Sequence, residues 1–501
     1  MQKIITLLIG FSLVAGSLQL QAQATTPEDM ITASEIKADL YFLASDHLKG
    51  RRTGSEGNNI AAQFIATQIE AAGFKPVPGH DSYFQKINFQ AVTPPSMGEL
   101  SMNGNTYKQK ENLLMMTGQG GQVDKAEAIF AGHGLAADYE GLDVEGKVVF
   151  VIGGDPEEEG NQATFAAMPI KRALAEKNGA VGLIEIYNLS FPWNFFLRYF
   201  GRERVGIGSD DPNGNNIPYG WIQASNEVDD LKKIQDGEKV KVSLKATAGS
   251  VKDMGSQNVV GVLEGTDPTL KNEYVLMSAH YDHVGVGKQG GGAFTEQDSI
   301  FNGARDNGIG TVTLIATARA LAKNPPKRSV IFFACTAEEI GLLGSKYYAD
   351  NPMIPLEQTI FDLNIDGAGY NDKSLVTVFG YDRTGVDQLA NAAAEQYGLK
   401  VLADPAPEQN LFDRSDNVSF AAKGVPAMTF SMGFTTFDEE IRKYYHQVTD
   451  NPDSVDYEYC EQYARAFATL ARKIANMEGK PTWIAGDKYE EAGKALYGEK
   501  K

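Results

Sequence analysis

The sequence predicts an α/β fold in which a mostly parallel or mixed sheet has helices on both faces and a small β-rich α/β domain is inserted into the chain. Two observations predict it. From residue 257 onward, short apolar runs of the strand type alternate with segments whose apolar residues recur at helical spacing. Between residues 125 and 248 the pattern changes to shorter β-rich runs, which indicates a second unit of structure.

The part that precedes the insert is predicted to contain two helices followed by extended chain. Apolar residues recur at helical spacing in both helical segments, and Gly73 ends the second one. The expected elements are helices at 31–45 and 59–72 and strands at 84–89 and 98–102. We assign residues 25–124 and 249–478 to one discontinuous domain, which is the larger of the two.

Residues 125–248 are expected to form the inserted domain. Its expected elements are strands at 126–130, 146–152 and 181–186 and a helix at 168–177. The segment Phe191–Phe200 inside it is unusually aromatic. Aromatic side chains in such number favour a place in a core or a lid, and a substrate-facing role is the weaker alternative.

The C-terminal half is predicted to supply most of the main sheet. Its expected strands are at 258–263, 274–279, 329–335, 359–365, 375–379 and 427–431, and its expected helices are at 311–323, 342–349, 386–397 and 457–477. The residues from 479 to 501 are mostly polar, so we expect a C-terminal tail that is mobile or only loosely docked.

The composition excludes some classes of partner. The chain has 501 residues and a formal net charge of −19, so nucleic acid and anionic membrane surfaces repel it. Its hydrophobic and charged fractions, 42% and 22%, are typical of a soluble globular protein. Its two cysteines are too few for a disulfide framework. Cys335 lies in an apolar strand and is expected to be a buried thiol, while pairing with Cys460 stays an open alternative.

The first 24 residues are typical of a signal peptide. Lys3 supplies a positive start, and the apolar run Ile4–Ala15 that follows is too short to cross a bilayer. The segment Ala22–Ala24 then fits the small-residue rule for signal peptidase. We therefore expect residues 1–24 to be removed, the protein to be exported to the periplasm or the extracellular space, and no membrane anchor to remain.

Acidic and histidine side chains follow directly after several predicted strands. His280 and Asp282 follow the strand that ends at residue 279. Glu338 and Glu339 follow the strand that ends at residue 335, and Asp366 follows the strand that ends at residue 365. Each of these motifs is weak alone. Because open α/β sheets place their sites at the carboxyl ends of parallel strands, the ordered set predicts a metal site there.

Two further candidate ligands lie in other loops, Asp306 ahead of a predicted helix and His446 directly after Tyr445. Imidazole and carboxylate donors without a thiolate set suit zinc. Two histidines and three acids, with one acid shared, would give each of two ions three protein ligands and an open position. A carboxylate such as that of Asp306 can bridge two ions roughly 3.5–4 Å apart.

Side chains next to the candidate ligands are expected to orient a ligand or to take part in catalysis. Asp282 lies two residues after His280, on the same side of an extended segment, and its carboxylate can accept the second imidazole N–H. Glu338 and Glu339 are adjacent, so their side chains diverge. One of them can ligate a metal while the other acts as a general base, and the spacing alone does not decide which.

These motifs resemble those of metallopeptidase family twenty-eight, the co-catalytic zinc aminopeptidases and their glutamate carboxypeptidase relatives. The matching pieces are Ser278–His283, Asn302–Gly308, Thr336–Ser345, Asn364–Asp366 and Tyr445–His446. The resemblance covers most of the mature chain and implies the zinc exopeptidase, phosphorylase/hydrolase-like fold. The insert, residues 125–248, resembles a protease-associated domain, which in relatives borders the substrate cleft without taking part in catalysis.

The resemblance also implies a role for each site residue. It implies two Zn²⁺ ions per chain, held by His280, Asp306, Glu339, Asp366 and His446. In this arrangement His280 and Asp366 hold one ion, Glu339 and His446 hold the other, and Asp306 bridges them. The catalytic residues are then Glu338 as general base, Tyr445 as a stabiliser of the oxyanion, and Asp282 behind its histidine. Asn417 departs from the family pattern, where many relatives have histidine.

The expected function is that of an exported di-zinc exopeptidase acting on peptides, with aminopeptidase activity favoured because the site has spare acids for a free amine. Arg305 and Arg414 lie close to the motifs and could bind a terminal carboxylate, which keeps a glutamate carboxypeptidase-like enzyme as an alternative. A glutaminyl-cyclase-like enzyme with one zinc ion and a non-catalytic binding protein are the less favoured alternatives.

Overall fold

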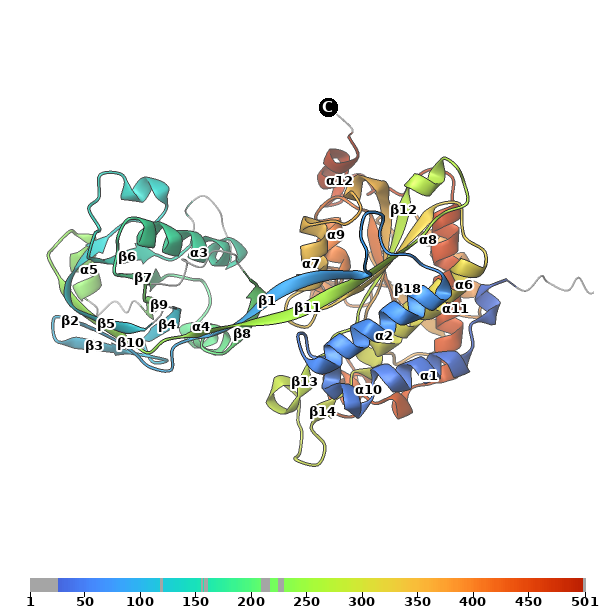
Figure 1. Ribbon diagram of the computed structural model, residues 1–501, viewed down its shortest axis with the longest axis horizontal. Coiled ribbons are helices and arrows are strands. Elements are labelled where there is room, and N and C mark those ends of the chain that lie inside the picture. Colours follow the sequence, from blue (N-terminus) through green and yellow to red (C-terminus); the bar gives the residue numbers. More distant parts are fainter. Residues whose placement is uncertain are drawn as a thin grey trace, which may run out of the picture.

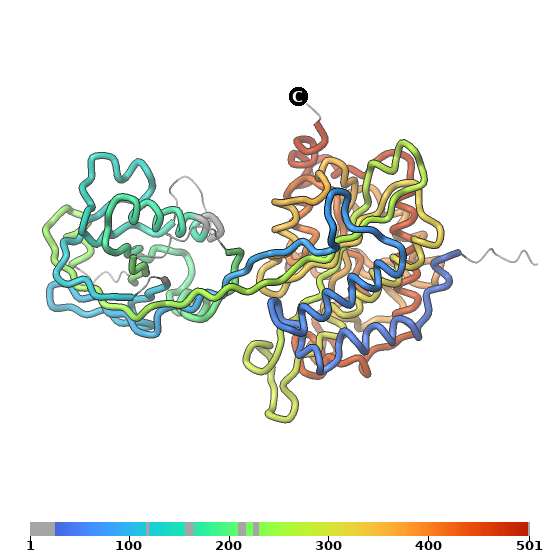
Figure 2. The backbone as a smooth tube through the Cα atoms, in the orientation of Figure 1, coloured from blue at the N-terminus to red at the C-terminus, as the bar shows by residue number. Residues whose placement is uncertain are grey.

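The computed structural model of the protein describes residues 26–117, 120–154, 156, 161–208, 217–223 and 229–498. This part of the chain forms two bodies joined by a long two-stranded ribbon (Figure 1). The larger body contains the N-terminal and C-terminal parts of the chain, and the smaller body contains the middle part (Figure 2). The predicted signal peptide, residues 1–24, lies outside the described residues.

The larger body is built on a mixed sheet, which has nine strands in the described part of the chain. In spatial order they are β18 (Lys400–Ala403), β17 (Leu375–Phe379), β19 (Ala427–Met432), β16 (Thr359–Ile365), β12 (Tyr274–His280), β15 (Ser329–Cys335), β11 (Ser250–Leu263), β1 (Phe84–Thr93) and β8 (Arg204–Ile207). Strand β12 runs parallel to both of its neighbours, β15 and β16, and every residue of those two strands is buried. Burial on both faces is what helices on both sides of a sheet produce.

Helices cover both faces of this sheet, which confirms the predicted fold class (Figure 1). One face is covered by α1 (Ala33–Leu43), α2 (Glu56–Ala72), α6 (Ile309–Lys323), α8 (Asp387–Glu395) and α11 (Tyr457–Asn476). The other is covered by α7 (Leu343–Asp350), α9 (Asn417–Ala421) and α12 (Glu490–Tyr497). The sequence marks the helix ends: the Asp456 side chain caps α11, and Gly73 ends α2 in the left-handed conformation.

The smaller body has its own mixed sheet, with eight strands among the described residues. In spatial order they are β3 (Asn105–Lys108), β2 (Gly98–Met102), β10 (Lys241–Ala246), β5 (Gly121–Phe130), β6 (Val148–Ile152), β7 (Gly182–Tyr187), β9 (Tyr219–Gln223) and β4 (Leu113–Thr117). Its helices are α3 (Asn161–Lys177), α4 (Trp193–Phe200) and α5 (Asp229–Gln235).

The insert begins earlier than the boundary at residue 125 that the sequence predicts. Strands β2 and β3 form a hairpin, and β2 also pairs along its length with β10. Because these short strands find their partners in the second sheet, the insert extends N-terminal of that boundary, back to Gly98. The sequence pattern missed this because the hairpin strands are too short to show which sheet completes them.

The ribbon between the two bodies is a continuation of the main sheet (Figure 1). Strand β1 pairs antiparallel with β11 from Phe84↔Val259 to Thr93↔Ser250. Strand β8, which follows α4 of the insert, adds to the outer edge of β1. Backbone hydrogen bonds therefore connect the insert to the larger body, in place of a flexible linker.

The aromatic segment of the insert lies mostly in a core. Trp193, Phe196 and Phe200 of α4 are buried among other apolar side chains of the smaller body. Phe195 and Tyr199, on the opposite face of this helix, are 57% and 54% exposed. This agrees with the core alternative for the segment.

The predicted tail is docked for most of its length, so the expectation of a mobile or loose tail is wrong for the residues described. The Trp483 side chain is buried, and its indole N–H donates to the Gly424 carbonyl. The Tyr497 hydroxyl of α12 donates to the Thr359 carbonyl at 2.6 Å. Two aromatic side chains therefore anchor a segment whose polar composition predicted the opposite. Across the described ranges, none of the helices has the length and apolar character that crossing a membrane demands.

Arg51 is buried beneath the edge of the sheet where the candidate ligands gather. Its guanidinium donates to four backbone carbonyls, which belong to Leu43, Tyr281, Asn302 and Gly303. Burial lowers the pKa of Arg51 to about 10. The side chain thereby connects the end of α1 to the loop after β12 and to the segment ahead of Asp306, next to the short strands β13 (Gly285–Val286) and β14 (Ile300–Phe301).

We predict that Arg51→Met lowers the free energy of unfolding by about 3 kcal/mol, because four buried carbonyls lose a charged donor. Arg52→Met is the matched control: the Arg52 guanidinium lies 3.7 Å from Glu203 at a partly exposed surface, where an ion pair contributes at most about 1 kcal/mol. Urea unfolding followed by fluorescence measures both. Equal stability of the two variants would contradict the role given to Arg51.

Candidate metal centre

The candidate ligands meet at one edge of the main sheet because three parallel strands end there. His280 is the last residue of β12, and Glu338 and Glu339 follow the end of β15. Asp366 follows the end of β16. Strand β12 lies between the other two and is parallel to both, so the three carboxyl ends lie side by side.

Asp306 and His446 reach this edge from two loops. Asp306 lies in the turn just before α6, and His446 lies in the loop that follows α10 (Glu439–Tyr444). The two parts of the chain are connected through the buried Asp450, whose carboxylate accepts the backbone N–H groups of Arg305 and Asp306. The Asn307 side chain donates to the Ile365 carbonyl at the end of β16. These bonds hold the backbone of Asp306 from both sides.

The first group of converging side chains is built around His280. Its Nε2 atom lies 3.3 Å from Asp366 Oδ1 and 3.4 Å from Asp306 Oδ1. Glu338 Oε2 lies farther away, at 4.0 Å. The His280 side chain is buried, so these carboxylates are its immediate surroundings.

The second group is built around His446. Its Nε2 atom lies 3.1 Å from Asp306 Oδ2 and 3.1 Å from Glu339 Oε2. Asp306 therefore belongs to both groups: one of its carboxylate oxygens faces His280 and the other faces His446. The structure thus brings together the five side chains that the sequence proposes as ligands, which are His280, Asp306, Glu339, Asp366 and His446.

The electrostatics of the site indicate a place for cations. Burial lowers the pKa of His446, but the contacts with Asp306 and Glu339 outweigh this effect and raise the pKa to about 10. Burial also opposes the charged form of His280, and the Glu338 and Asp366 carboxylates raise its pKa well above the usual value. In a protein without metal, protons on the two imidazoles would supply the positive charge that these carboxylates attract.

The donor set fits divalent metal ions such as zinc. Ligand atoms of His283, Asp306, Glu339 and His446 lie within 4.8 Å of one another, and so do those of His280, Glu338 and Asp366. Imidazole nitrogens and carboxylate oxygens are typical zinc ligands. Buried atoms without a hydrogen-bond partner among the described residues, Nε2 of His283 among them, are a further sign that these groups meet around an ion.

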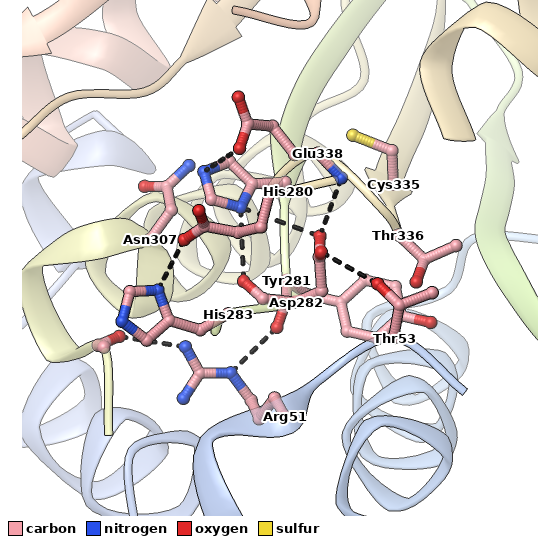
Figure 3. A network of polar contacts seen from close by, with 12 residues as sticks. Arg51, Thr53, His280, Tyr281, Asp282, His283, Asn307, Cys335, Thr336 and Glu338 are labelled. Carbon is pink, nitrogen blue, oxygen red and sulfur yellow. Dashed lines mark hydrogen bonds and ion pairs between the residues drawn. The ribbon is translucent and has the colours of Figure 1, made fainter. Parts of the chain in front are cut away.

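Asp282 supports the site in a way that differs in part from the expectation. Its carboxylate accepts the Thr53 hydroxyl at 3.0 Å and the Glu338 backbone N–H at 3.1 Å (Figure 3). The expected hydrogen bond from His280 to this carboxylate is replaced by a shorter contact. Nδ1 of His280 lies 3.8 Å from the carboxylate and 3.2 Å from the Asp282 backbone carbonyl. Asp282 therefore orients His280 through its main chain, while its carboxylate fixes the backbone at Glu338.

Glu338 points into the pocket beside the two ligand groups. Burial raises the pKa of its carboxyl well above the usual value, and the neighbouring Asp366 and Glu339 carboxylates add to this against the attraction of His280. In Glu339, by contrast, burial also raises the pKa, but the His283 and His446 imidazoles outweigh it and the net shift is downward. The pKa values of these two adjacent glutamates are thus shifted in opposite directions. A raised pKa suits a general base, and a lowered pKa suits a metal ligand.

Tyr445 lines the same pocket as both glutamates. Its ring stacks on the His446 ring with centroids 4.3 Å apart. Burial, and then the carboxylates of Asp306 and Glu339, raise the pKa of its hydroxyl far above the usual value. The hydroxyl therefore keeps its proton and can act as a hydrogen-bond donor.

The segment 415–417 lies beside and beneath the pocket. Ser415 lines the pocket, while the buried Asp416 accepts the Cys335 thiol at 2.9 Å. The Asn417 amide donates to the Phe412 carbonyl and its oxygen accepts the Thr429 hydroxyl, so this side chain serves the fold. Cys335 and Cys460 are both buried free thiols, which confirms the expectation for Cys335.

His283 is a site residue for which the sequence predicted no role. Its Nδ1 atom lies 2.7 Å from Glu339 Oε1, and its ring meets that of His446 edge to face at 5.5 Å. The contact to Glu339 lacks the alignment of a hydrogen bond, so both ring nitrogens of this buried side chain have no such partner among the described residues. The only feature of the sequence that could have indicated this role is that His283 lies three residues after the candidate ligand His280. We infer that His283 holds the Glu339 carboxylate.

Comparisons with known proteins match this chain to a family of peptidases. The model of peptidase family M28 matches residues 258–471. Aminopeptidase YwaD of Bacillus subtilis strain 168 is 25% identical over 506 residues, which cover 97% of this chain and 96% of that protein. Leucine aminopeptidase 2 of Trichophyton equinum is 24% identical over 393 residues, covering 76% and 68%. A solved aminopeptidase from Aneurinibacillus sp. strain AM-1 shares the fold, with a TM-score of 0.53 at 22% identity and coverage of 92% and 98%.

We predict that His283→Ala weakens zinc binding about 10- to 100-fold at one of the two groups, because residues that orient metal ligands typically contribute that much to affinity. Competition with a chromogenic chelator measures the affinities. His80→Ala, which removes an exposed histidine, is the control and should leave both affinities unchanged. Unaltered zinc binding by the His283 variant would show that Glu339 needs no such support.

Proposed function

Because this chain belongs to peptidase family M28, we propose that it is a di-zinc aminopeptidase that removes N-terminal residues from peptides. One observation carries the proposal: Asp306 directs one carboxylate oxygen toward His280 and the other toward His446. This is the arrangement by which one carboxylate holds two cations. His280 and Asp366 would complete one zinc site, and Glu339 and His446 the other.

When bound, zinc supplies a Lewis acid that polarises the scissile carbonyl and lowers the pKa of water. Glu338 would take the proton from the attacking water and pass it to the leaving amine, because its carboxyl has a raised pKa and lies 4.0 Å from His280. The Tyr445 hydroxyl would donate a hydrogen bond to the oxyanion. Asp282 would keep His280 and the Glu338 backbone in place.

Three observations favour aminopeptidase action over carboxypeptidase action. Glu338 lines the pocket and is the one carboxylate there that the proposed zinc sites do not use, so it is available to a free amine. Arg305, one of the two cations that kept the alternative open, is buried and stacks on Tyr444, with its Nη2 donating to the Ser454 carbonyl. It lies outside this pocket and is not available for a terminal carboxylate. The relatives YwaD and leucine aminopeptidase 2 are both named aminopeptidases.

We further propose that the enzyme acts outside the cytoplasm, after residues 1–24 have directed export. The features of that segment support this: its positive start, its short apolar run and the Ala22–Ala24 cleavage pattern. The insert is proposed to act as a protease-associated domain. Strands β1 and β11 run past the carboxyl end of β15 to reach the insert, which supports a role for it beside the edge of the sheet where the ligand groups lie.

Glu338→Gln is expected to keep its zinc and to lose about 1,000-fold in kcat, because the amide cannot accept the proton of water. Mass spectrometry of the metal and hydrolysis of Leu-p-nitroanilide measure the two properties. Glu70→Gln, which alters an exposed glutamate of α2, is the control and should keep both. Turnover close to that of the unaltered protein in a zinc-loaded Glu338 variant would overturn the assignment of the base.

An end-blocking experiment tests the direction of cleavage. The free amine is the group that an aminopeptidase must bind, so we expect N-acetylation of a pentapeptide to abolish its hydrolysis and C-terminal amidation to leave hydrolysis largely intact. Mass spectrometry of the digested peptides identifies the shortened end. Cleavage of the acetylated peptide from its C-terminus would exclude aminopeptidase action and restore the carboxypeptidase alternative.

A further inference from the structure

The pocket beside the ligand groups contains one side chain that the proposed reaction does not use. Among the residues that line it, four are acids of the candidate metal centre, and Arg414 is the only lysine or arginine. Arg414 ends the turn Leu411–Arg414, just before Ser415. A cation at this position has no evident part in binding zinc or in moving a proton.

Arg414 is exposed, and none of the described residues forms an ion pair or a hydrogen bond with its guanidinium. The acids next to it in the sequence are engaged elsewhere. Asp413 accepts the Tyr489 hydroxyl and pairs with Lys488. Asp416 is buried and accepts the Cys335 thiol. The guanidinium is therefore free to bind a group that enters the pocket.

The rest of the pocket wall suits a side chain with an apolar stem and a polar end. Apolar surface comes from Phe379, Leu411, Phe434 and Phe437, and Ser431 supplies a hydroxyl group that has no hydrogen-bond partner among the described residues. A carboxylate bound here would meet Arg414 in the bidentate geometry that guanidinium favours. Two divalent cations would balance the four acids of the site, so an acidic substrate would not be repelled.

We propose that Arg414 binds a carboxylate of the substrate and makes the enzyme selective for peptides that carry an acid in this pocket. The proposal rests on the aminopeptidase function and names its substrate class. The carboxylate has two sources. It is either the side chain of an N-terminal glutamate or aspartate, or the terminal carboxylate of a dipeptide.

Pairs of substrates that differ only in charge test the proposal on the zinc-loaded full chain. Glu- and Gln-p-nitroanilide differ at the side chain, and Leu-Gly and Leu-Gly-amide differ at the C-terminus. We expect the kcat/KM ratio of acid to amide to fall about 10- to 100-fold in Arg414→Gln for one of these pairs. The pair that responds identifies the source of the carboxylate.

Two further variants separate recognition from general damage. Lys423→Gln removes one positive charge from a surface lysine that pairs with Asp350, outside the pocket, and should keep both ratios. Arg414→Glu should reverse the charge preference, so that kcat/KM for Lys-p-nitroanilide rises relative to kcat/KM for Glu-p-nitroanilide. A disturbance of the fold would lower the rates for both members of a pair and leave their ratios unchanged.

A binding measurement keeps this inference separate from the proposed activity. Calorimetry on zinc-loaded Glu338→Gln compares the binding of free L-glutamate with that of L-glutamine, and of Leu-Gly with Leu-Gly-amide, with and without Arg414→Gln. If no substrate is hydrolysed but an acid binds better than its amide in an Arg414-dependent way, the aminopeptidase function fails and this inference stands. Acid-to-amide ratios that Arg414→Gln leaves unchanged, in hydrolysis and in binding, would overturn the inference.

Discussion

The repulsion among carboxylates at one edge of a sheet is the constraint on which the rest of the site depends. Asp306, Glu338, Glu339 and Asp366 share one pocket, and such a group is stable only when cations or protons compensate its charge. In a protein without metal, the raised pKa values of His280, His446 and Glu338 show that these groups bind protons more readily than usual, which offsets the negative charge. The two divalent ions of the proposed function would compensate this charge better than protons can, because they would also bind the remaining oxygen atoms.

The scaffold around this charge is a set of hydrogen bonds between segments far apart in sequence. Arg51 connects the N-terminal helices to the loops that carry His280 and Asp306, Asp450 holds the backbone at Asp306, and Asp282 holds the backbone at Glu338. Most of these bonds end on main-chain groups, so they fix the positions of the ligands without competing for the ions. The buried polar network and the metal centre therefore form one structure.

The sequence predicted the parts of the site that follow from periodicity and strand ends, and it missed those that follow from tertiary contacts. His280, the Glu338–Glu339 pair and Asp366 could be placed together because β12, β15 and β16 read clearly as buried strands. His283 could not, because its contact with Glu339 depends on how two loops fold over each other. The insert boundary and the docked tail were misjudged for the same reason: strand β2 and Trp483 find their partners far along the chain.

Anomalous diffraction at the zinc edge from crystals of the zinc-loaded protein tests the central claim most directly. The account predicts two peaks roughly 3.5–4 Å apart, with one beside His280 and Asp366, the other beside Glu339 and His446, and Asp306 in contact with both. A single peak, or two peaks of which one lies out of reach of Asp306, would contradict it.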